Sequence, residues 1–162
     1  MAQGASAFQQ AQEAEAERLY RAALDEVAQA GPEDPRLAVT LNTLAVLYHA
    51  QHHYARAERL YQRVLQLLEQ AVGSEHPTLA TTMNNLAVVR EAQGKLDDAE
   101  PLYQRAIALI ERTAGPAHPS LAAALDNYAD LLRKMQREAE AEPLARRARA
   151  IWARQERPAA GQ

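Results

Sequence analysis

The sequence predicts an all-α solenoid of about seven helices, in which helix pairs of similar sequence stack on one another. The 162-residue chain repeats itself every 42 residues, as the spacing of Pro35, Pro77 and Pro119 illustrates. Self-similarity at a fixed period of this size is typical of stacked supersecondary units. Within each repeat the apolar residues recur at the i, i+3, i+4, i+7 spacing of one helix face, and no segment alternates as a half-buried strand would.

The N-terminal element is expected to be a single helix over residues 13–30. Its sequence AEAERLYRAALDEV, which starts at Ala14, matches only the second helix of the later repeats. We therefore interpret it as an orphan half-repeat that packs on the first complete repeat. Residues 1–12 form an N-terminal segment that is a candidate for disorder.

The first helix of each complete repeat is predicted to begin at Pro35, Pro77 or Pro119. Proline suits a helix start because the N–H that it lacks would have no partner there. Asp34 is suitably positioned to cap the first of these helices. The expected buried face consists, repeat by repeat, of Leu41, Leu44, Ala45 and Tyr48, of Met83, Leu86, Ala87 and Arg90, and of Leu125, Tyr128, Ala129 and Leu132.

The second helix of each repeat follows a short chain reversal. Gly94 is the residue expected to turn the chain, and the other two copies lack a glycine there. Pro101 and Pro143 fall in the first turn of their helices, where proline costs little. The expected buried face consists of Ala57, Leu60, Tyr61, Val64 and Leu68, of Ala99, Leu102, Tyr103, Ala106 and Ile110, and of Ala141, Leu144, Ala145, Ala148 and Trp152.

Small residues recur on both helices of every repeat. Two helices approach closely only where small side chains occupy the crossing point, and a leucine at such a point would overpack the site. We expect the crossings at Ala45, Ala87 and Ala129 on the first helices and at Ala57, Ala99 and Ala141 on the second helices.

Composition argues against several classes of function. The formal net charge of -3 does not favour binding nucleic acid through its phosphates. The chain has no cysteine, so it has no disulfide and no thiolate metal site. No apolar run approaches the roughly 18 residues of a membrane helix, and the start lacks the features of a signal peptide. We expect a cytoplasmic protein that binds neither nucleic acid nor membranes; a periplasmic protein whose signal peptide had been removed would look the same.

The pattern L-N-x-L-A-x-L-Y, followed by Y-x-x-A-E-x-L-Y and by H-P, resembles the tetratricopeptide repeat (TPR). Its carriers are LNTLAVLYHAQHHYARAERLYQRVL, MNNLAVVREAQGKLDDAEPLYQRAI and LDNYADLLRKMQREAEAEPLARRAR. The period is longer than the usual 34 or so and is similar to that of the kinesin-light-chain variety. The resemblance covers Pro35 to about Trp152 and implies a right-handed superhelix of helix-turn-helix repeats. The expected repeats span 35–72, 77–114 and 119–155, and a tail expected to be disordered spans 156–162.

The last of these repeats departs from the pattern by becoming more polar. Glu138 stands where the earlier repeats have Tyr54 and Leu96, and Arg149 stands where they have Leu65 and Ile107. A terminal repeat needs a polar outer face, so we interpret residues 119–155 as a capping repeat.

A superhelix of this kind has a concave groove lined by the first helices. The residues opposite the buried face are therefore the candidates for binding a peptide. They are Val39, Asn42, Val46 and His49 in the first repeat, Thr81, Asn84, Asn85, Val88 and Glu91 in the second, and Ala123, Asp126, Asn127, Asp130 and Arg133 in the third.

Within this groove, the series Asn42, Asn84 and Asp126 gives the clearest functional signal. A carboxamide has two donors and an acceptor, so it can pair with both the N–H and the C=O of an extended peptide. The resemblance implies the same role, since asparagines hold peptide ligands in similar proteins. The alternative is that these are solvated or locally bonded helix residues.

The charges of the expected groove differ from those of related peptide-binding grooves, which often use Lys or Arg to bind acidic motifs or a terminal carboxylate. Arg133 is the groove's only cation and lies at one end, whereas Glu91, Asp126 and Asp130 make its second half acidic. We therefore hypothesise that a bound segment carries a basic residue toward the third repeat.

Other features give weaker signals. His49, His52 and His53 have a helical spacing that suits a metal, but no further ligand adjoins them, so no metal is expected. His76 and His118 precede prolines and are interpreted as structural. The arginine-rich final segment is a docking surface for an acidic partner or for a membrane surface, or it is a solvated face. The absence of phosphate-binding and nucleophile motifs argues against an enzyme and against a cofactor.

The sequence therefore favours a non-catalytic module for protein–protein interaction, which binds an extended peptide or partner segment in its concave groove. Two alternatives stay open. The chain is an assembly module that forms homo-oligomers through its terminal helices, or it is a scaffold fragment of a larger regulator.

Overall fold

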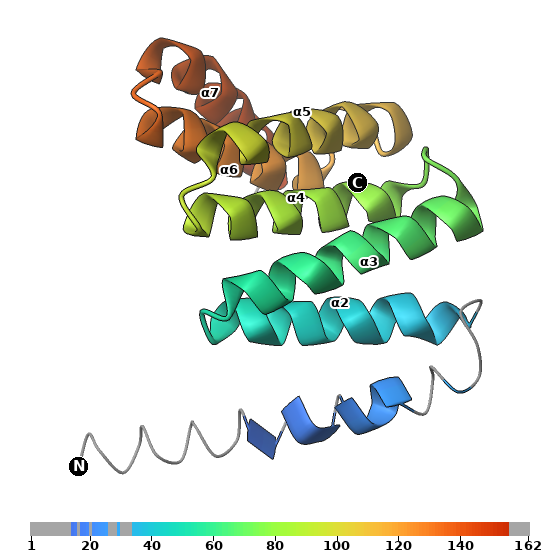
Figure 1. The fold of residues 1–162 in the computed structure, drawn as a ribbon. Coiled ribbons are helices and arrows are strands. Elements are labelled where there is room, and N and C mark those ends of the chain that lie inside the picture. The colour runs from blue at the N-terminus through green and yellow to red at the C-terminus, as the bar shows by residue number, and fades with distance from the viewer. Residues whose placement is uncertain (1–13, 16, 20, 26–28, 30–33, 156–162) are drawn as a thin grey trace. The chain divides into compact units, whose positions relative to one another are not determined.

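The computed structural model describes residues 14–15, 17–19, 21–25, 29 and 34–155. Within these residues all regular structure is helical, as predicted (Figure 1). The chain forms two compact units, residues 1–71 and 72–162. The predictions for residues 1–12 and 156–162 fall outside the described part of the chain.

Unit 1, residues 1–71, contains helix α2 (Pro35–Ala50) and most of helix α3 (Tyr54–Val72). The described residues between 14 and 29 are also helical. Asp34 caps α2, because its side chain accepts a hydrogen bond of 2.9 Å from the backbone N–H of Arg36. This capping bond was expected from the sequence.

The hydrophobic core of unit 1 joins all three of its helical segments. Leu37 and Leu41 of α2 form a buried cluster with Val64 and Leu67 of α3, and Leu24 packs against this cluster. Burial of such side chains is the main source of stability in a small helical unit. The N-terminal helical segment therefore contributes to the core of unit 1.

A polar cluster around Tyr48 also ties the N-terminal segment to α2. The Tyr48 hydroxyl donates to Oε1 of Glu17 over 3.0 Å and accepts from Nη2 of Arg21 over 2.8 Å. The guanidinium of Arg56 lies 5.4 Å from the centre of the Tyr48 ring, a distance at which a cation is attracted to an aromatic face.

Unit 2, residues 72–162, consists of two helix pairs. The first pair is α4 (Pro77–Ala92) and α5 (Leu96–Thr113), and the second is α6 (Pro119–Lys134) and α7 (Glu138–Gln155). The helices of each pair pack on each other, α5 packs on α6, and α4 also contacts α6 (Figure 1). As predicted, proline occupies the first turn of α4 and α6. Pro101 and Pro143, which were expected in the first turns of α5 and α7, instead lie inside those helices, beyond the first turn.

Histidine caps both first helices of unit 2. Nδ1 of His76 accepts the backbone N–H of Thr78 over 3.4 Å, and Nδ1 of His118 accepts that of Ser120 over 3.2 Å. An imidazole nitrogen thus caps the N-terminus of α4 and of α6, as the carboxylate of Asp34 caps that of α2. The structural role expected for the histidine–proline pairs is therefore that of a helix cap.

The reversal between paired helices has the same backbone conformation in all three repeats. Gly94 has a φ of 77°, and His52 and Gln136, at the equivalent positions, have φ values of 59° and 62°. Only glycine adopts this left-handed region without strain. The reversal expected at Gly94 therefore occurs in the other two repeats as well, without the residue that suits it.

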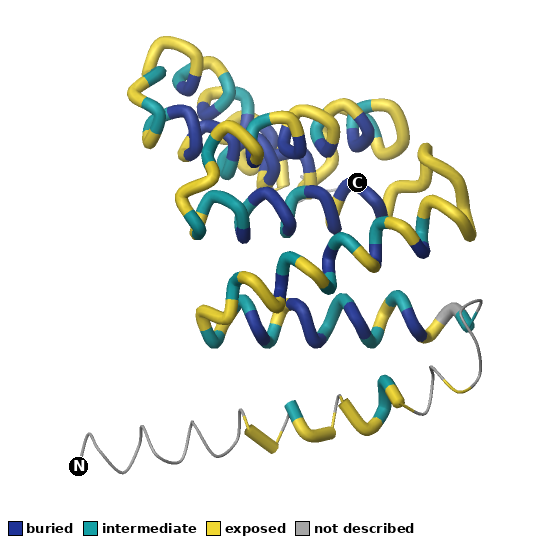
Figure 2. Tube along the Cα trace, viewed as in Figure 1, coloured by how far each residue is buried: buried dark blue, intermediate teal, exposed yellow. Residues whose placement is uncertain are grey.

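The alanines expected at the helix crossings are fully buried in both units. None of the six has exposed surface: Ala45, Ala57, Ala87, Ala99, Ala129 and Ala141. Figure 2 shows that burial follows one side of each helix of unit 2, as an amphipathic helix requires.

The end of α7 differs from the prediction. Trp152 was expected on the buried face, but it is 37% exposed and its neighbour Ile151 is buried instead. The indole N–H of Trp152 donates to Oδ2 of Asp126 over 2.9 Å. The polar group of the indole is satisfied at the edge of the core, where one side of the ring stays in water.

Candidate functional site

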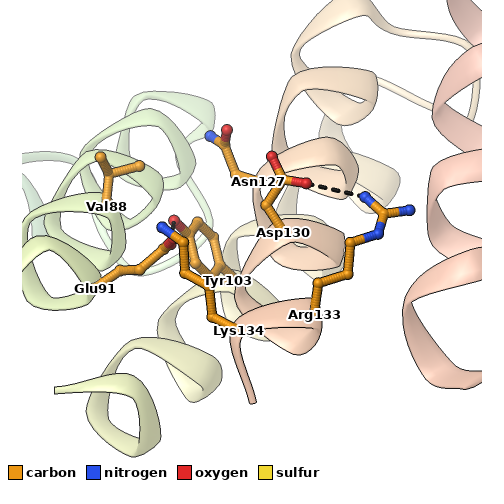
Figure 3. Close-up of a pocket in the computed structure, with 7 residues that line it drawn as sticks. All are labelled: Val88, Glu91, Tyr103, Asn127, Asp130, Arg133 and Lys134. Atoms are coloured by element: carbon orange, nitrogen blue, oxygen red, sulfur yellow. Dashed lines mark hydrogen bonds and ion pairs between the residues drawn. The ribbon is translucent and has the colours of Figure 1, made fainter. Parts of the chain in front are cut away.

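The candidate site is a pocket of about 310 Å³ in unit 2, beside helices α4, α5 and α6 (Figure 3). Its lining combines apolar, polar and charged side chains. The lining residues are Val88, Glu91, Tyr103, Asn127, Asp130, Arg133 and Lys134.

Helix periodicity explains how two helices supply most of this lining. Val88 and Glu91 are three residues apart on α4 and therefore share a face. On α6, Asn127 and Lys134 lie seven residues apart with Asp130 between them, again on one face. Because α4 contacts α6, the two faces border a common space.

A pair of asparagines joins the two helices beside the pocket. Nδ2 of Asn127 donates a hydrogen bond of 3.2 Å to Oδ1 of Asn84. Neither side chain makes another hydrogen bond within the described part of the chain. The pair therefore retains the amide NH₂ of Asn84 and the carbonyl oxygen of Asn127, a donor and an acceptor held side by side.

Tyr103 forms the floor of the pocket from helix α5. Its ring stacks on Tyr128, with ring centres 6.1 Å apart, and its hydroxyl donates to Oε2 of Glu91 over 2.8 Å. Burial raises the pKa of the Tyr103 phenol far above its ordinary value, and the Glu91 carboxylate raises it further. The phenol is therefore a neutral hydrogen-bond donor that fixes the position of Glu91.

The charged groups of the pocket are paired with one another. Oε1 of Glu91, whose side chain is only 10% exposed, accepts from Nζ of Lys134 over 2.6 Å. Oδ1 of Asp130 accepts from Nη1 of Arg133 over 2.9 Å. Two carboxylates thus balance two cations, and the lining carries no net charge.

This balance corrects the expectation that Arg133 is the only cation of the groove and that its second half is acidic. Lys134 was not among the expected residues, yet it contributes the second positive charge to the pocket. The spacing could have revealed it, because Lys134 lies one turn beyond Asp130 on the same helix face. Tyr103 gave no such signal, since its ring belongs to the buried face of α5 and only its hydroxyl reaches Glu91.

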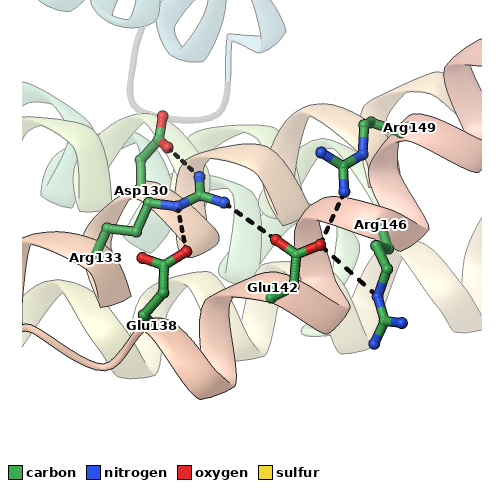
Figure 4. A network of polar contacts seen from close by, with 6 residues as sticks. All are labelled: Asp130, Arg133, Glu138, Glu142, Arg146 and Arg149. Carbon is green, nitrogen blue, oxygen red and sulfur yellow. Dashed lines mark hydrogen bonds and ion pairs between the residues drawn. The ribbon is translucent and has the colours of Figure 1, made fainter.

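Arg133 also belongs to an ion-pair network between α6 and α7 (Figure 4). Besides Asp130 it contacts Glu138 over 3.3 Å and Glu142 over 4.0 Å. The whole network consists of Asp130, Arg133, Glu138, Glu142, Arg146 and Arg149. Arg133 is therefore held by groups of its own repeat.

Five of the predicted groove residues line the pocket: Val88, Glu91, Asn127, Asp130 and Arg133. Asn84 adjoins it through Asn127. Thr81, Asn85 and Ala123 are not among its lining residues, and Asp126 is bonded to Trp152.

The predicted groove residues of unit 1 lie along helix α2. Val39 is 68% exposed and Val46 is 46% exposed, and Asn42, between them, is half-buried. The side chain of Asn42 makes no hydrogen bond within the described residues. One turn beyond Val46, burial and to a smaller extent the charge of His52 lower the pKa of His49.

The histidines near the end of α2 contact aromatic rings. Nδ1 of His52 lies 2.7 Å from the hydroxyl of Tyr54, and the ring of His53 packs edge-on against Tyr48, with centres 6.1 Å apart. Among the residues described, no group of three or more His, Cys, Asp or Glu side chains could hold a metal ion.

Comparison with known proteins identifies the family. A family profile described as tetratricopeptide repeat matches residues 1–70 and 78–154. The chain belongs to the tetratricopeptide repeat family. No curated protein sequence matches it.

Solved structures of TPR proteins have the same fold. BtubC (BKLC) from P. vanneervenii matches with a TM-score of 0.82 and 24% identity over 93% of this chain and 61% of that one. A putative kinesin light chain with nearly identical TPR-like repeats from Podosopora anserina matches with a TM-score of 0.73 and 26% identity, over 91% of this chain and 70% of that one. A single-residue variant of the second protein gives a TM-score of 0.75.

The chain is therefore a TPR protein whose repeats are similar to those of a putative kinesin light chain. It spans 61% of the length of the BtubC chain. The TPR fold is generally a module for protein–protein interaction, and proteins of the family are typically non-enzymatic scaffolds. In the part of the chain that the structure describes, no helix is both long enough and apolar enough to cross a bilayer.

Proposed function

We propose that unit 2 binds an extended segment of a partner protein and that the Asn84–Asn127 pair holds the backbone of that segment. The hydrogen bond between the two asparagines is the observation that carries the proposal. It leaves one amide donor and one carbonyl acceptor beside the pocket. If both amide groups are rotated by 180°, the hydrogen bond between them reverses its direction, and one NH₂ group and one carbonyl oxygen again remain. The pair therefore offers a donor and an acceptor in either arrangement.

An extended backbone presents the matching groups. Its N–H and C=O point outward without internal partners, so one residue of the segment can donate to Asn127 and accept from Asn84. Such contacts do not depend on the sequence of the ligand. In this proposal Asn127 takes the role first expected of Asp126, whose carboxylate already accepts from Trp152.

The same proposal extends to helix α2 of unit 1. Asn42 lies between Val39 and Val46, two apolar side chains that are largely exposed. A carboxamide flanked by apolar side chains suits an extended segment, because the amide bonds the backbone while the valines contact its side chains. Asn42 is therefore a separate candidate for a backbone contact within unit 1.

Selection from a random peptide library tests the proposal. The library is selected on the wild-type protein and on the double variant Asn84→Ala, Asn127→Ala, and melting curves confirm that both are folded. We expect peptides that bind the wild type and lose at least tenfold in affinity for the variant, since buried polar groups left without partners cost about 1–3 kcal/mol. Peptides that bind both proteins equally would contradict the proposal.

Self-assembly through α7 is the second candidate function, and the exposed face of Trp152 favours it. The ion-pair network beside that helix opposes it, because a contact with another copy would desolvate these charges (Figure 4). Light scattering over a range of protein concentrations distinguishes the two. A mass that rises toward a multiple of the monomer would favour assembly.

A further inference from the structure

We propose that the pocket beside the asparagine pair seats an uncharged carboxamide side chain, glutamine or asparagine, of the bound segment. This inference rests on the proposed function and adds the chemical class of the ligand. Four features of the pocket support it: its charge balance, its spare hydrogen-bonding capacity, its shape, and its unfavourable geometry for charged groups.

The first feature is that the charges of the lining cancel. Glu91 pairs with Lys134, and Asp130 pairs with Arg133. A charged side chain that enters such a pocket gives up part of its hydration and meets no net opposite charge in return. A neutral polar side chain gives up much less hydration, so the pocket favours it.

The second feature is the hydrogen-bonding capacity that remains. Lys134, whose side chain is 60% exposed, uses one N–H on Glu91, so its ammonium has two more to donate. Oδ2 of Asp130 accepts no hydrogen bond within the described part of the chain. Both side chains line the pocket (Figure 3). A carboxamide has the matching groups, because its NH₂ donates to Asp130 and its oxygen accepts from Lys134.

The third feature is the size and surface of the cavity. At about 310 Å³ it is near the lower limit of roughly 300 Å³ for pockets that hold small ligands. Val88 provides an apolar wall, against which the methylene groups of a glutamine or asparagine can pack. The cavity therefore suits one side chain of moderate size.

The fourth feature is that either charged alternative meets an opposing group. A basic side chain directed at Asp130 would compete with Arg133 and approach Lys134. An acidic side chain directed at Lys134 would compete with Glu91 and approach Asp130. This reasoning replaces the hypothesis, drawn from the sequence, that a bound segment carries a basic residue here.

The experiment changes the net charge of the pocket and determines which side chain the selected peptides then carry at the position that enters it. A phage-displayed library of random peptides is selected on wild type, on Asp130→Asn and on Lys134→Met. The first variant leaves the pocket with a net positive charge and the second with a net negative charge. Asp97→Asn and Arg154→Gln are matched controls, because both residues are exposed on the surface and lie outside the pocket.

We expect glutamine or asparagine at one fixed position of the peptides selected on wild type and on both controls. Replacing that residue with Glu or Lys in a synthetic peptide should weaken binding about tenfold, as an unpaired polar site does. Asp130→Asn should shift the selection to Asp or Glu, and Lys134→Met should shift it to Lys or Arg.

The possible failures are distinguishable. Peptides that depend on Asn84 and Asn127 but carry a charged residue at the fixed position would overturn this inference and leave the proposed function standing. The same holds if the selected residue does not change in Asp130→Asn and Lys134→Met. A selection that yields no peptide dependent on the two asparagines would overturn both proposals.

Discussion

Replacing Ala87 with leucine should destabilise the protein markedly. Ala87 lies on α4 and is fully buried, at the position that Ala45 and Ala129 occupy in the other repeats. Leucine adds three carbon atoms to a site without free surface, so neighbouring side chains or the helix itself must move. Overpacking of this kind costs about 1–3 kcal/mol.

Thermal melting followed by circular dichroism measures the effect. For a chain of this size, 1 kcal/mol lowers the melting temperature by about 2–4 °C, so Ala87→Leu should melt about 2–12 °C below wild type. Ala108→Leu is the matched control, because Ala108 is exposed on α5 and the change there should stay within about 0.5 kcal/mol. Equal melting of Ala87→Leu and wild type, or an equal loss in the control, would refute the reasoning.

Three other changes have defined outcomes. The hydrogen bond from Arg137 holds the pKa of Glu100 below its ordinary value of 4.5. The ionised carboxylate therefore stabilises unit 2 fully above pH 4.5, and this stabilisation is lost as the pH falls through the lower pKa of the folded state. Glu100→Gln should therefore melt below wild type near neutral pH and approach it in strong acid, and a gap independent of pH would contradict this. Gln136→Gly should stabilise the protein by roughly 0.5–1 kcal/mol and raise the midpoint of urea unfolding, because glycine removes the strain of a side chain in the left-handed conformation. An unchanged midpoint would show that the position is not strained. His118→Ala should cost about 1 kcal/mol in a denaturant titration through loss of the α6 cap, and His118→Asp should not; equal losses would exclude the capping role.

Local signals in the sequence predicted the fold well. The helix starts at Pro77 and Pro119 and the buried alanines follow from the covalent properties of proline and from the spacing of small residues. The end of α7 was harder to predict. Ile151 and Trp152 are adjacent, and which of them faces the core depends on tertiary contacts, including the bond from Trp152 to Asp126.

The candidate site was predictable only in part, for a related reason. Helical spacing identified which faces of α4 and α6 border the pocket, but it could not show which partner each polar group chooses. Asn84 pairs with Asn127, whereas Asp126, the next member of the expected series, pairs with an indole. Likewise, the charge of the pocket became clear only with the ion pair between Glu91 and Lys134.

The network between α6 and α7 also bears on how an array of this kind could grow by duplication. Glu100 on α5 receives hydrogen bonds from Tyr128 and Arg137, which belong to the following repeat. Its counterpart 42 residues later, Glu142, pairs instead with Arg133 and Arg149 of its own repeat. A copied helix pair that stacked onto α7 would have to desolvate these ion pairs, at a cost in free energy that opposes the gain from its apolar contacts. A plain copy of the helix pair would therefore pack less favourably on α7 than α6 packs on α5.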